Sequence, residues 1–282
     1  MQVPYGLSAG CRLFKNLMST ELQNEHNLPP TSAAEAHHRR IRSFVRRAGR
    51  ITVAQERALQ EAWPNYGVEI TSGSTPDSPP DAICNSSNKK VLDLLQIFGR
   101  RAPRVLEIGF GNGDTLLHGA LSRPAVDFLG IEVHRAGVGH LLHNVAERKL
   151  PNVRVICHDA VEVLEQHLPP DSLDEVWVLF PDPWHKARHH KRRLIQAPFV
   201  ELLVSRIKAG GTLHLATDWQ AYAEQMLEVL TANPQLKNCA QDDSGFTTRP
   251  TWRPLTRFER RGQRLGHSVW DLHFERINSA QS

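Results

Sequence analysis

The chain has 282 residues, of which 40% are hydrophobic and 7% aromatic, a composition typical of a globular protein. No apolar run approaches the roughly 20 residues that a membrane-spanning helix needs, so we expect no membrane partner. The 4 cysteines are scattered and show neither the CxxC pairs of a zinc site nor a disulfide framework, which favours a reducing, cytoplasmic location.

A formal net charge of +4 is a mild basic excess, and three segments carry it. Residues 37–50, 185–193 and 249–264 are rich in arginine, lysine and histidine, and tryptophan or phenylalanine lies within or beside each. One basic run is usually a solvated face, but three such runs favour a polyanion as the partner.

The first 90 residues show little of the periodicity of a packed domain. Residues 1–36 are polar and patternless, and we expect a disordered tail or a start codon assigned too far upstream. Residues 37–90 are expected to form a basic arm and a linker rich in Ser, Pro and Asn. Within the arm, residues 51–68 predict one short helix that ends at Pro64 and Gly67.

From Val91 onward, apolar runs of strand length alternate with stretches of helical pattern, which predicts an α/β domain over residues 91–282. The apolar runs are continuous, as in strands covered on both faces, so we expect an open, doubly wound, mostly parallel sheet. The expected strands are 104–110, 126–133, 153–158, 174–180 and 211–217, with 267–276 as a further candidate. The expected helices are 114–121, 137–149, 160–167, 196–207 and 219–231.

Ligands of an open α/β sheet bind beyond the carboxyl ends of its strands, so residues at these ends are candidate site residues. The first expected strand runs into "LEIGFGNGD", whose glycines Gly109, Gly111 and Gly113 let the backbone approach a ligand closely. A dinucleotide fingerprint needs a sixth-position glycine and a phosphate on the helix start, but Asp114 stands there. This acid and Glu107 would repel a phosphate, which disfavours NAD. A purely structural tight turn stays open as the alternative.

Three further strand ends carry acids. Glu132 can accept hydrogen bonds from ribose hydroxyls, and Asp159 can accept from an adenine amino group or serve only as a helix N-cap. Asp182 ends the fourth expected strand, so with Glu107 the set forms an acidic pocket with acceptors for an adenosine. S-adenosylmethionine carries a sulfonium and an ammonium but no phosphate. The set therefore favours that cofactor, and a methyltransferase over a dehydrogenase.

The chain resembles the bacterial tRNA (guanine-N7-)-methyltransferase family over roughly residues 38–276, apart from the linker. The stretches that carry the resemblance are "RRIRSFVRRAGRIT", "LEIGFGNGD", "GIEVH", "CHDAVEVL", "LFPDPWHKARHHKRR", "ATDW" and "LTRFERRGQRLGHSVWDLHFER". "PDPWHK" and "TRFE" are specific, whereas the glycine loop is common to class I methyltransferases.

The resemblance implies a seven-stranded Rossmann-like sheet with a basic N-terminal arm, in a monomer or a homodimer. It also implies methyl transfer from S-adenosylmethionine to N7 of a variable-loop guanosine in tRNA, forming 7-methylguanosine. The residues matched to cofactor positions are Glu107, Glu132, Asp159 and Asp182, beside the loop glycines, and Asp182 also matches the catalytic position. The residues matched to substrate positions are Lys186, Asp218, Thr256, Arg257, Phe258 and Glu259.

The chemistry of guanine N7 explains why a lone carboxylate suffices. N7 is a lone pair without a proton, so its methylation needs alignment and tolerance of the positive charge that appears on the ring, but no base. Asp182, between Pro181 and Pro183, has few directions in which to point, and we expect it to stabilise that charge. The alternative is a turn-capping Asp, since Asp and Pro favour turns. Trp184 can stack on the base or close the pocket.

Asp218 and Glu259 offer acceptors for N1–H and N2–H, the two donors of the Watson–Crick edge of guanine. The alternatives are an N-cap for Asp218, ahead of an expected helix, and a surface ion pair for Glu259. Lys186 can contact phosphate or base, or be an ordinary exposed lysine.

The basic run after Lys186 directly follows Asp182, so it is expected at the mouth of the site. Its side chains would hold phosphates of a folded RNA without reading sequence, and they are Arg188, His189, His190, Lys191, Arg192 and Arg193. Its histidines, with His185, lack Cys or acid ligands beside them, so no metal site is expected.

Two other functions fit parts of the sequence. An adenine N6-methyltransferase motif has two successive prolines after its first residue, whereas Asp182 is followed by Pro183 and Trp184. A non-catalytic RNA-binding protein with a relic pocket is the second alternative, and the intact set of acids argues against it.

Overall fold

The computed structural model describes residues 43–44, 50–70, 91–264, 266 and 268–278. The expectations for residues 1–36, for most of the basic arm and for the linker lie outside the described residues. The proposed division of the chain into tail, arm and domain therefore stays a prediction.

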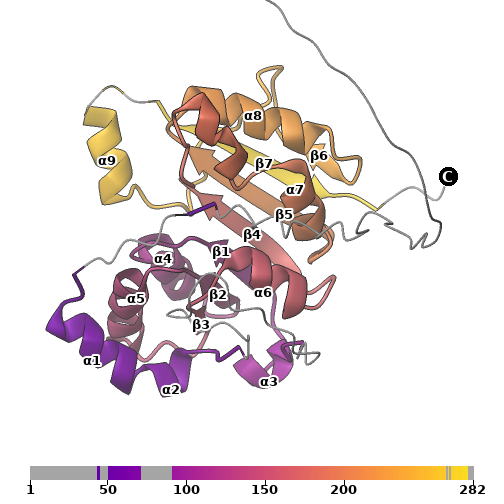
Figure 1. Cartoon of the computed structure of the whole chain (residues 1–282). Helices are drawn as coiled ribbons and strands as arrows, with labels where there is room; N and C mark the ends of the chain where they lie inside the picture. Colours follow the sequence, from indigo (N-terminus) through magenta and orange to yellow (C-terminus); the bar gives the residue numbers. More distant parts are fainter. Residues whose placement is uncertain (1–42, 45–49, 71–90, 265, 267, 279–282) are drawn as a thin grey trace, which may run out of the picture. The chain divides into compact units, whose positions relative to one another are not determined.

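The described residues form one seven-stranded sheet in the order β3-β2-β1-β4-β5-β7-β6 (Figure 1). β1 to β5 pair in parallel, and β7 runs antiparallel between β5 and β6. The strands are β1 (Arg104–Ile108), β2 (Asp127–Ile131), β3 (Val153–Ile156), β4 (Leu173–Leu179), β5 (Ile207–Thr217), β6 (Leu236–Asn238) and β7 (Trp270–Arg276). The predicted doubly wound, mostly parallel sheet is confirmed. The sequence did not predict β6, because its 3 residues are too few for a pattern.

Helices cover both faces of the sheet (Figure 1). α6, α7 and α8 share a buried cluster with inward residues such as Leu106 and Leu213, and α1, α4 and α5 share another with Val105 and Phe128. The helices are α1 (Val53–Glu61), α2 (Trp63–Tyr66), α3 (Leu94–Phe98), α4 (Asp114–Ser122), α5 (Arg135–Glu147), α6 (Ala160–Gln166), the 3-10 helix η1 (Ala187–Arg192), α7 (Ala197–Val204), α8 (Gln220–Thr231) and α9 (Arg257–Arg264).

The helix expected over 51–68 is in fact two helices. Thr52 and Gln55 form a capping box at the start of α1, and Gly67 ends α2. Pro64 does not end the helix as predicted, because it lies in the first turn of α2, where a missing N–H breaks no helical hydrogen bond.

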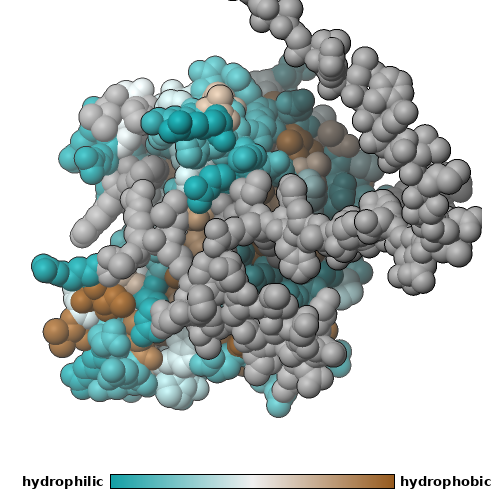
Figure 2. Space-filling view, viewed as in Figure 1, coloured by the Kyte–Doolittle hydropathy of each residue, from teal (hydrophilic) through white to brown (hydrophobic). Residues whose placement is uncertain are grey.

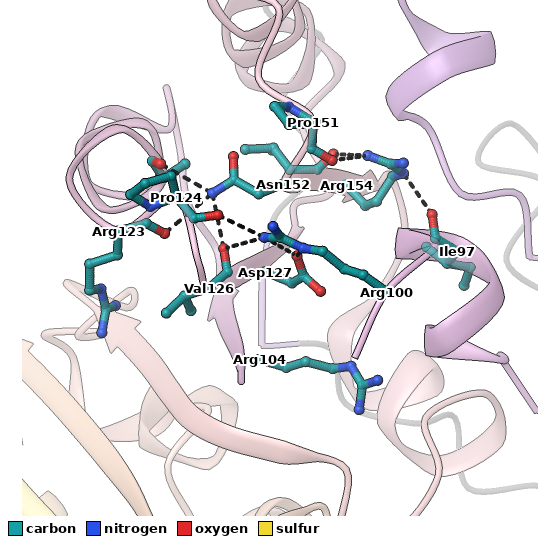
Figure 3. A network of polar contacts seen from close by, with 12 residues as sticks. Ile97, Arg100, Arg104, Arg123, Pro124, Val126, Asp127, Pro151, Asn152 and Arg154 are labelled. Atoms are coloured by element: carbon teal, nitrogen blue, oxygen red, sulfur yellow. Dashed lines mark hydrogen bonds and ion pairs between the residues drawn. The ribbon is translucent and has the colours of Figure 1, made fainter. Parts of the chain in front are cut away.

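A network of polar contacts occupies the amino ends of β1, β2 and β3 (Figure 3). The carboxylate of Asp127 is fully buried, and its Oδ1 lies 2.7 Å from Nη2 of Arg100. The side-chain amide of Asn152 donates to the carbonyls of Ala120 and Val126, at 3.1 and 2.9 Å. These contacts tie the start of the sheet to the loop after α4.

The surface over α9 is hydrophilic, whereas a hydrophobic patch lies near the start of α1 (Figure 2), where Val53 is 88% exposed. Among the described helices, none combines the length and the apolar character that crossing a membrane requires.

Candidate active site

The carboxyl ends of β1 to β4 open into two cavities. The first has a volume of about 180 Å³ and is lined by three of the predicted acids, Glu132, Asp159 and Asp182. The second has a volume of about 240 Å³ and is lined by the fourth, Glu107. Phe180 lines both cavities, so they adjoin, and the parallel strands bring the four acids to one edge of the sheet.

The glycine loop connects β1 to α4 in a conformation that favours glycine. Gly109, Gly111 and Gly113 have φ angles of 71°, 58° and 79°, which an L side chain adopts only with strain. Asp114 then occupies the first turn of α4 and lines the second cavity, in the place where a dinucleotide site would hold a phosphate.

Glu132 fixes this loop to the end of β2. It is 6% exposed, and its Oε2 accepts a hydrogen bond from the Gly111 amide at 2.9 Å. Its Oε1 accepts from the amides of Val133 and His134, at 2.7 and 2.9 Å. The carboxylate is therefore held rigidly at the wall of the first cavity.

Glu107 is buried, with one of its carboxyl oxygens unpartnered within the described part of the chain. It is 3% exposed, and its Oε2 has no hydrogen-bond partner among the described residues. Burial, reinforced by the charges of Glu132 and Asp114, raises the pKa of Glu107 to about 8. A cationic group in the second cavity would favour the charged form and supply the missing partner.

Asp159 ends the loop after β3 and caps α6. Its Oδ1 accepts from the Val161 amide at 2.9 Å, so the N-cap interpretation is confirmed. Because the residue also lines the first cavity, capping fixes the position of its carboxyl group there without excluding a ligand contact.

Asp182 lies at the apex of a strained turn after β4. Phe180 and Trp184, on either side of Pro181-Asp182-Pro183, have φ angles of 53° and 48°, which non-glycine residues rarely adopt. Asp182 is exposed and lines the first cavity. Strain of this kind persists only where surrounding contacts enforce it, and it concentrates at functional sites.

The basic run forms η1 and the residues around it. Lys186, Arg188 and Lys191 are exposed, as a phosphate contact requires. His189 stacks on Trp184 with ring centroids 5.9 Å apart. Burial and the surrounding cations, Arg188 foremost, lower the pKa of His189, so this surface carries a concentrated positive charge.

Trp184 and Arg192 hold two residues of the arm, Ser43 and Phe44, against the first cavity. Nε1 of Trp184 donates to the Ser43 carbonyl at 3.0 Å, and Nη2 of Arg192 donates to the Phe44 carbonyl at 3.2 Å. The Arg192 guanidinium also lies 3.9 Å from the centre of the Trp184 ring. Ser43 and Phe44 line the first cavity, a contribution that sequence reasoning missed because nothing in their pattern marks a ligand contact.

Arg193 departs from its prediction. It is 4% exposed, and its Nε donates to the Pro183 carbonyl at 2.9 Å. A phosphate contact does not suit a buried guanidinium whose donors point inward, so its position argues against the predicted RNA contact.

The predicted substrate residues come from two elements. Asp218 is half-buried at the carboxyl end of β5, and Trp219 rather than Asp218 is the N-cap residue of α8, contrary to the alternative interpretation. Thr256 lines the second cavity, and its Oγ1 accepts from the Glu259 amide at 3.2 Å. The substrate segment thus reaches the cavity that Glu107 faces. The side chains of Arg257 and Phe258 lie outside the described set.

Glu259 is buried, with 2% exposure, and both of its carboxylate oxygens accept from Arg253, at 2.8 and 3.1 Å. The ion-pair alternative fits this position, except that the pair is buried rather than on the surface. Arg253 is 0% exposed and also donates to Asp271 in β7, at 3.1 and 2.9 Å. Sequence reasoning missed Arg253, because only the fold brings Asp271 and Glu259 to it.

No group of three or more His, Cys, Asp or Glu side chains within the described ranges is placed to hold a metal ion. The acids at the strand ends line the two adjoining cavities.

The chain is similar to known proteins over most of its length. A family model described as "Putative methyltransferase" matches residues 101–272. A tRNA (guanine-N(7)-)-methyltransferase of Paraburkholderia xenovorans is 56% identical over 259 residues, which cover 92% of this chain and 92% of that protein. Proteins of the same name from Burkholderia ambifaria and Burkholderia pseudomallei are 54% and 57% identical, covering 90% and 85% of this chain and 96% and 83% of their own length.

Among solved structures, the crystal structure of the 16S rRNA methyltransferase KamB aligns with a TM-score of 0.50 and 15% sequence identity. The alignment covers 67% of this chain and 95% of that one, which shows a shared fold.

Proposed function

Because this chain belongs to the family of tRNA (guanine-N(7)-)-methyltransferases, its reaction is methyl transfer to N7 of guanine in tRNA, and we propose that S-adenosylmethionine donates the methyl group and a variable-loop guanosine accepts it. A tRNA substrate agrees with the cytoplasmic location expected from the cysteines.

The observation that best supports the cofactor is the unpartnered oxygen of Glu107. A buried carboxyl oxygen without a partner is costly, and the ammonium of S-adenosylmethionine is a suitable partner for Oε2 of Glu107. Glu132 and Asp159, at the wall of the adjoining cavity, would hold the ribose and the adenine. The residues present therefore fit the cofactor. When bound, it supplies an electrophilic methyl group on a sulfonium.

Asp182 would act on the acceptor rather than on the methyl group. Guanine N7 needs no base, and the ring becomes positively charged as the new N–C bond forms. A carboxylate held near that ring stabilises the charge most strongly when it need not reorient during the reaction. The strained turn around Asp182 supports this role, because it restricts the carboxylate before substrate arrives.

The substrate would be held from both sides of the site. Lys186, Arg188 and Lys191 around η1 are exposed and suit phosphate contacts, and Asp218 and Thr256 suit contacts to the guanine. Glu259 would hold Thr256 in place, since its amide donates to Oγ1 of Thr256 while its carboxylate is fixed by Arg253. The roles of Arg257 and Phe258 stay predictions.

Methyl transfer from labelled S-adenosylmethionine to unmodified tRNA transcripts tests the proposal. Transcripts with and without a variable-loop guanosine should differ, and the label should be released as 7-methylguanine from the first alone. Label on adenine N6 would favour the adenine methyltransferase alternative. Tight tRNA binding without any label would favour the non-catalytic alternative.

A further inference from the structure

Arg193 differs from its neighbours in the basic run. Arg188 and Lys191 are exposed, whereas Arg193 is 4% exposed, and its Nη2 lies 3.1 Å from the imidazole Nε2 of His190. A basic side chain that is held inside the protein, in a run whose other members are exposed or only partly buried, needs a role other than phosphate binding.

The contacts of Arg193 join the turn that carries the candidate catalytic acid to α8. Nε donates to the Pro183 carbonyl at 2.9 Å, and Nη1 donates to Oε1 of Gln225 at 2.5 Å and to the Ala221 carbonyl at 3.4 Å. The guanidinium also lies 4.8 Å from the centre of the Tyr222 ring. The planar donor set of arginine matches these separate directions, whereas the ammonium of lysine has no fixed plane of donors.

The bond to Pro183 acts on the strained part of the turn. Pro183 separates Asp182 from Trp184, whose φ angle is 48°. An unsupported segment would relax from that angle, and the carboxylate of Asp182 would turn with it. Because α8 is anchored in the core through Tyr222 and Met226, Arg193 transmits the rigidity of the core to the turn.

We propose that Arg193 is a positioning residue whose hydrogen bond to the Pro183 carbonyl sets the direction of the Asp182 carboxylate, and that it makes no contact with RNA. The inference rests on the proposed role of Asp182. The basic run then has two functions: its exposed residues bind phosphate, and the buried Arg193 orients the carboxylate of Asp182.

The test compares Arg193→Lys with Lys191→Gln. For each we would measure the single-turnover rate of methyl transfer at saturating tRNA, the affinity for S-adenosylmethionine, the melting temperature, and the tRNA Kd over a range of salt concentrations. Arg206→Lys is the matched control, since this half-buried arginine also donates to a backbone carbonyl, that of Leu164, away from the turn.

Arg193→Lys should lower the transfer rate by about 10- to 100-fold, with cofactor affinity and the salt dependence of tRNA binding unchanged. Lys191→Gln should instead weaken tRNA binding and reduce the slope of log K against log salt by about 0.7–0.9. Arg206→Lys should leave the transfer rate within about twofold of wild type, since it does not touch the turn.

Three results would overturn the inference: an unchanged transfer rate in Arg193→Lys, a reduced salt slope like that of Lys191→Gln, or a loss of rate that merely follows lost cofactor affinity and melting temperature. If Arg193→Lys does not fold, Gln225→Ala takes its place, because it removes a partner of Arg193 and should give a smaller loss of rate alone. An inactive wild type would instead refute the proposed function, and the inference with it.

Discussion

A buried acid lies at each edge of the sheet, and the two acids differ in whether a cation of the protein is paired with them. At the amino edge, Asp127 is 0% exposed, and Arg100 supplies the counter-charge at its Oδ1, although its Oδ2 has no hydrogen-bond partner among the described residues (Figure 3). At the carboxyl edge, Glu107 is 3% exposed, and one of its oxygens has no partner within the part of the chain that the structure describes. The protein thus supplies a counter-charge to the buried acid at the amino edge, whereas within the described residues no ion pair neutralises Glu107, which leaves that charge to a ligand.

The largest effect is expected at the amino edge. Asp127→Ala removes the partner of Arg100 and empties a buried polar site, so the free energy of unfolding should fall by about 3 kcal/mol. Urea unfolding measures this loss. The rate of methyl transfer per folded molecule should stay near that of wild type. A large loss of this rate would contradict the view that the amino edge serves stability and not catalysis.

Asp182→Ala should give the converse result at the carboxyl edge. The residue is exposed, so the melting temperature should change little, whereas kcat should fall by about 100-fold, equivalent to about 2.7 kcal/mol of barrier. Steady-state transfer to a tRNA transcript measures it, with Asp243→Ala, an exposed acid far along the chain, as the control. A kcat near the wild-type value would contradict a catalytic role and favour the alternative in which Asp182 only caps a turn.

Glu107→Gln should weaken S-adenosylmethionine binding by about tenfold, because the amide cannot pair electrostatically with the ammonium. Isothermal titration measures that affinity, with Asp93→Asn, at a helix start outside the site, as the control. An affinity equal to that of wild type would show that Glu107 does not pair with the ammonium of the cofactor, and would argue against the cofactor proposal.

The same substitution should change how stability depends on pH. Folding raises the pKa of Glu107 from 4.5 to about 8, so between these values the folded state holds a proton that the unfolded state has lost. Its stabilising contribution is complete below about pH 4.5 and is lost as the pH rises through about 8. Urea unfolding at about pH 6 and about pH 8 should show a decline that is smaller in Glu107→Gln. An identical decline in both proteins would place the titrating group elsewhere.

The smallest effect is expected at the exposed rim. Arg188→Gln should weaken tRNA binding only a few-fold near physiological salt and lower the salt slope by about 0.7–0.9, since it removes a single phosphate contact. Filter binding over a salt series measures both quantities. An unchanged slope would show that Arg188 does not contact a phosphate of the tRNA, and would direct the search to the other exposed basic residues.

The positions that sequence predicted well are those that a strand end fixes. Parallel strands bring their carboxyl ends to one edge, so Glu107, Glu132, Asp159 and Asp182 had to meet once the strands were recognised. Each follows a continuous apolar run that is evident without the fold. Pro64 was misjudged for a local reason, because the pattern does not separate a helix end from the first turn of the next helix.

The positions that sequence missed depend on partners far along the chain. Arg193 is one of several consecutive basic residues, and it points inward because the Pro183 carbonyl and residues of α8 such as Gln225 contact its guanidinium. Arg253 is buried because Asp271 and Glu259 reach it from β7 and α9. The pattern of one segment does not show which charged or polar groups of another segment lie next to it. Buried arginines such as these can therefore be recognised only from the three-dimensional structure.

The place of β7 in the sheet has a consequence for synthesis of the protein. β7 enters between β5 and β6, and Arg253 has its partner Asp271 only when β7 is present. During translation, β1 to β5 and the acids of the cofactor cavities can assemble first, because their pairing involves none of the later residues. The contacts of Arg253 with Asp271 can form only after β7 has been made. The segment that carries Thr256 therefore gains this anchor only late in synthesis.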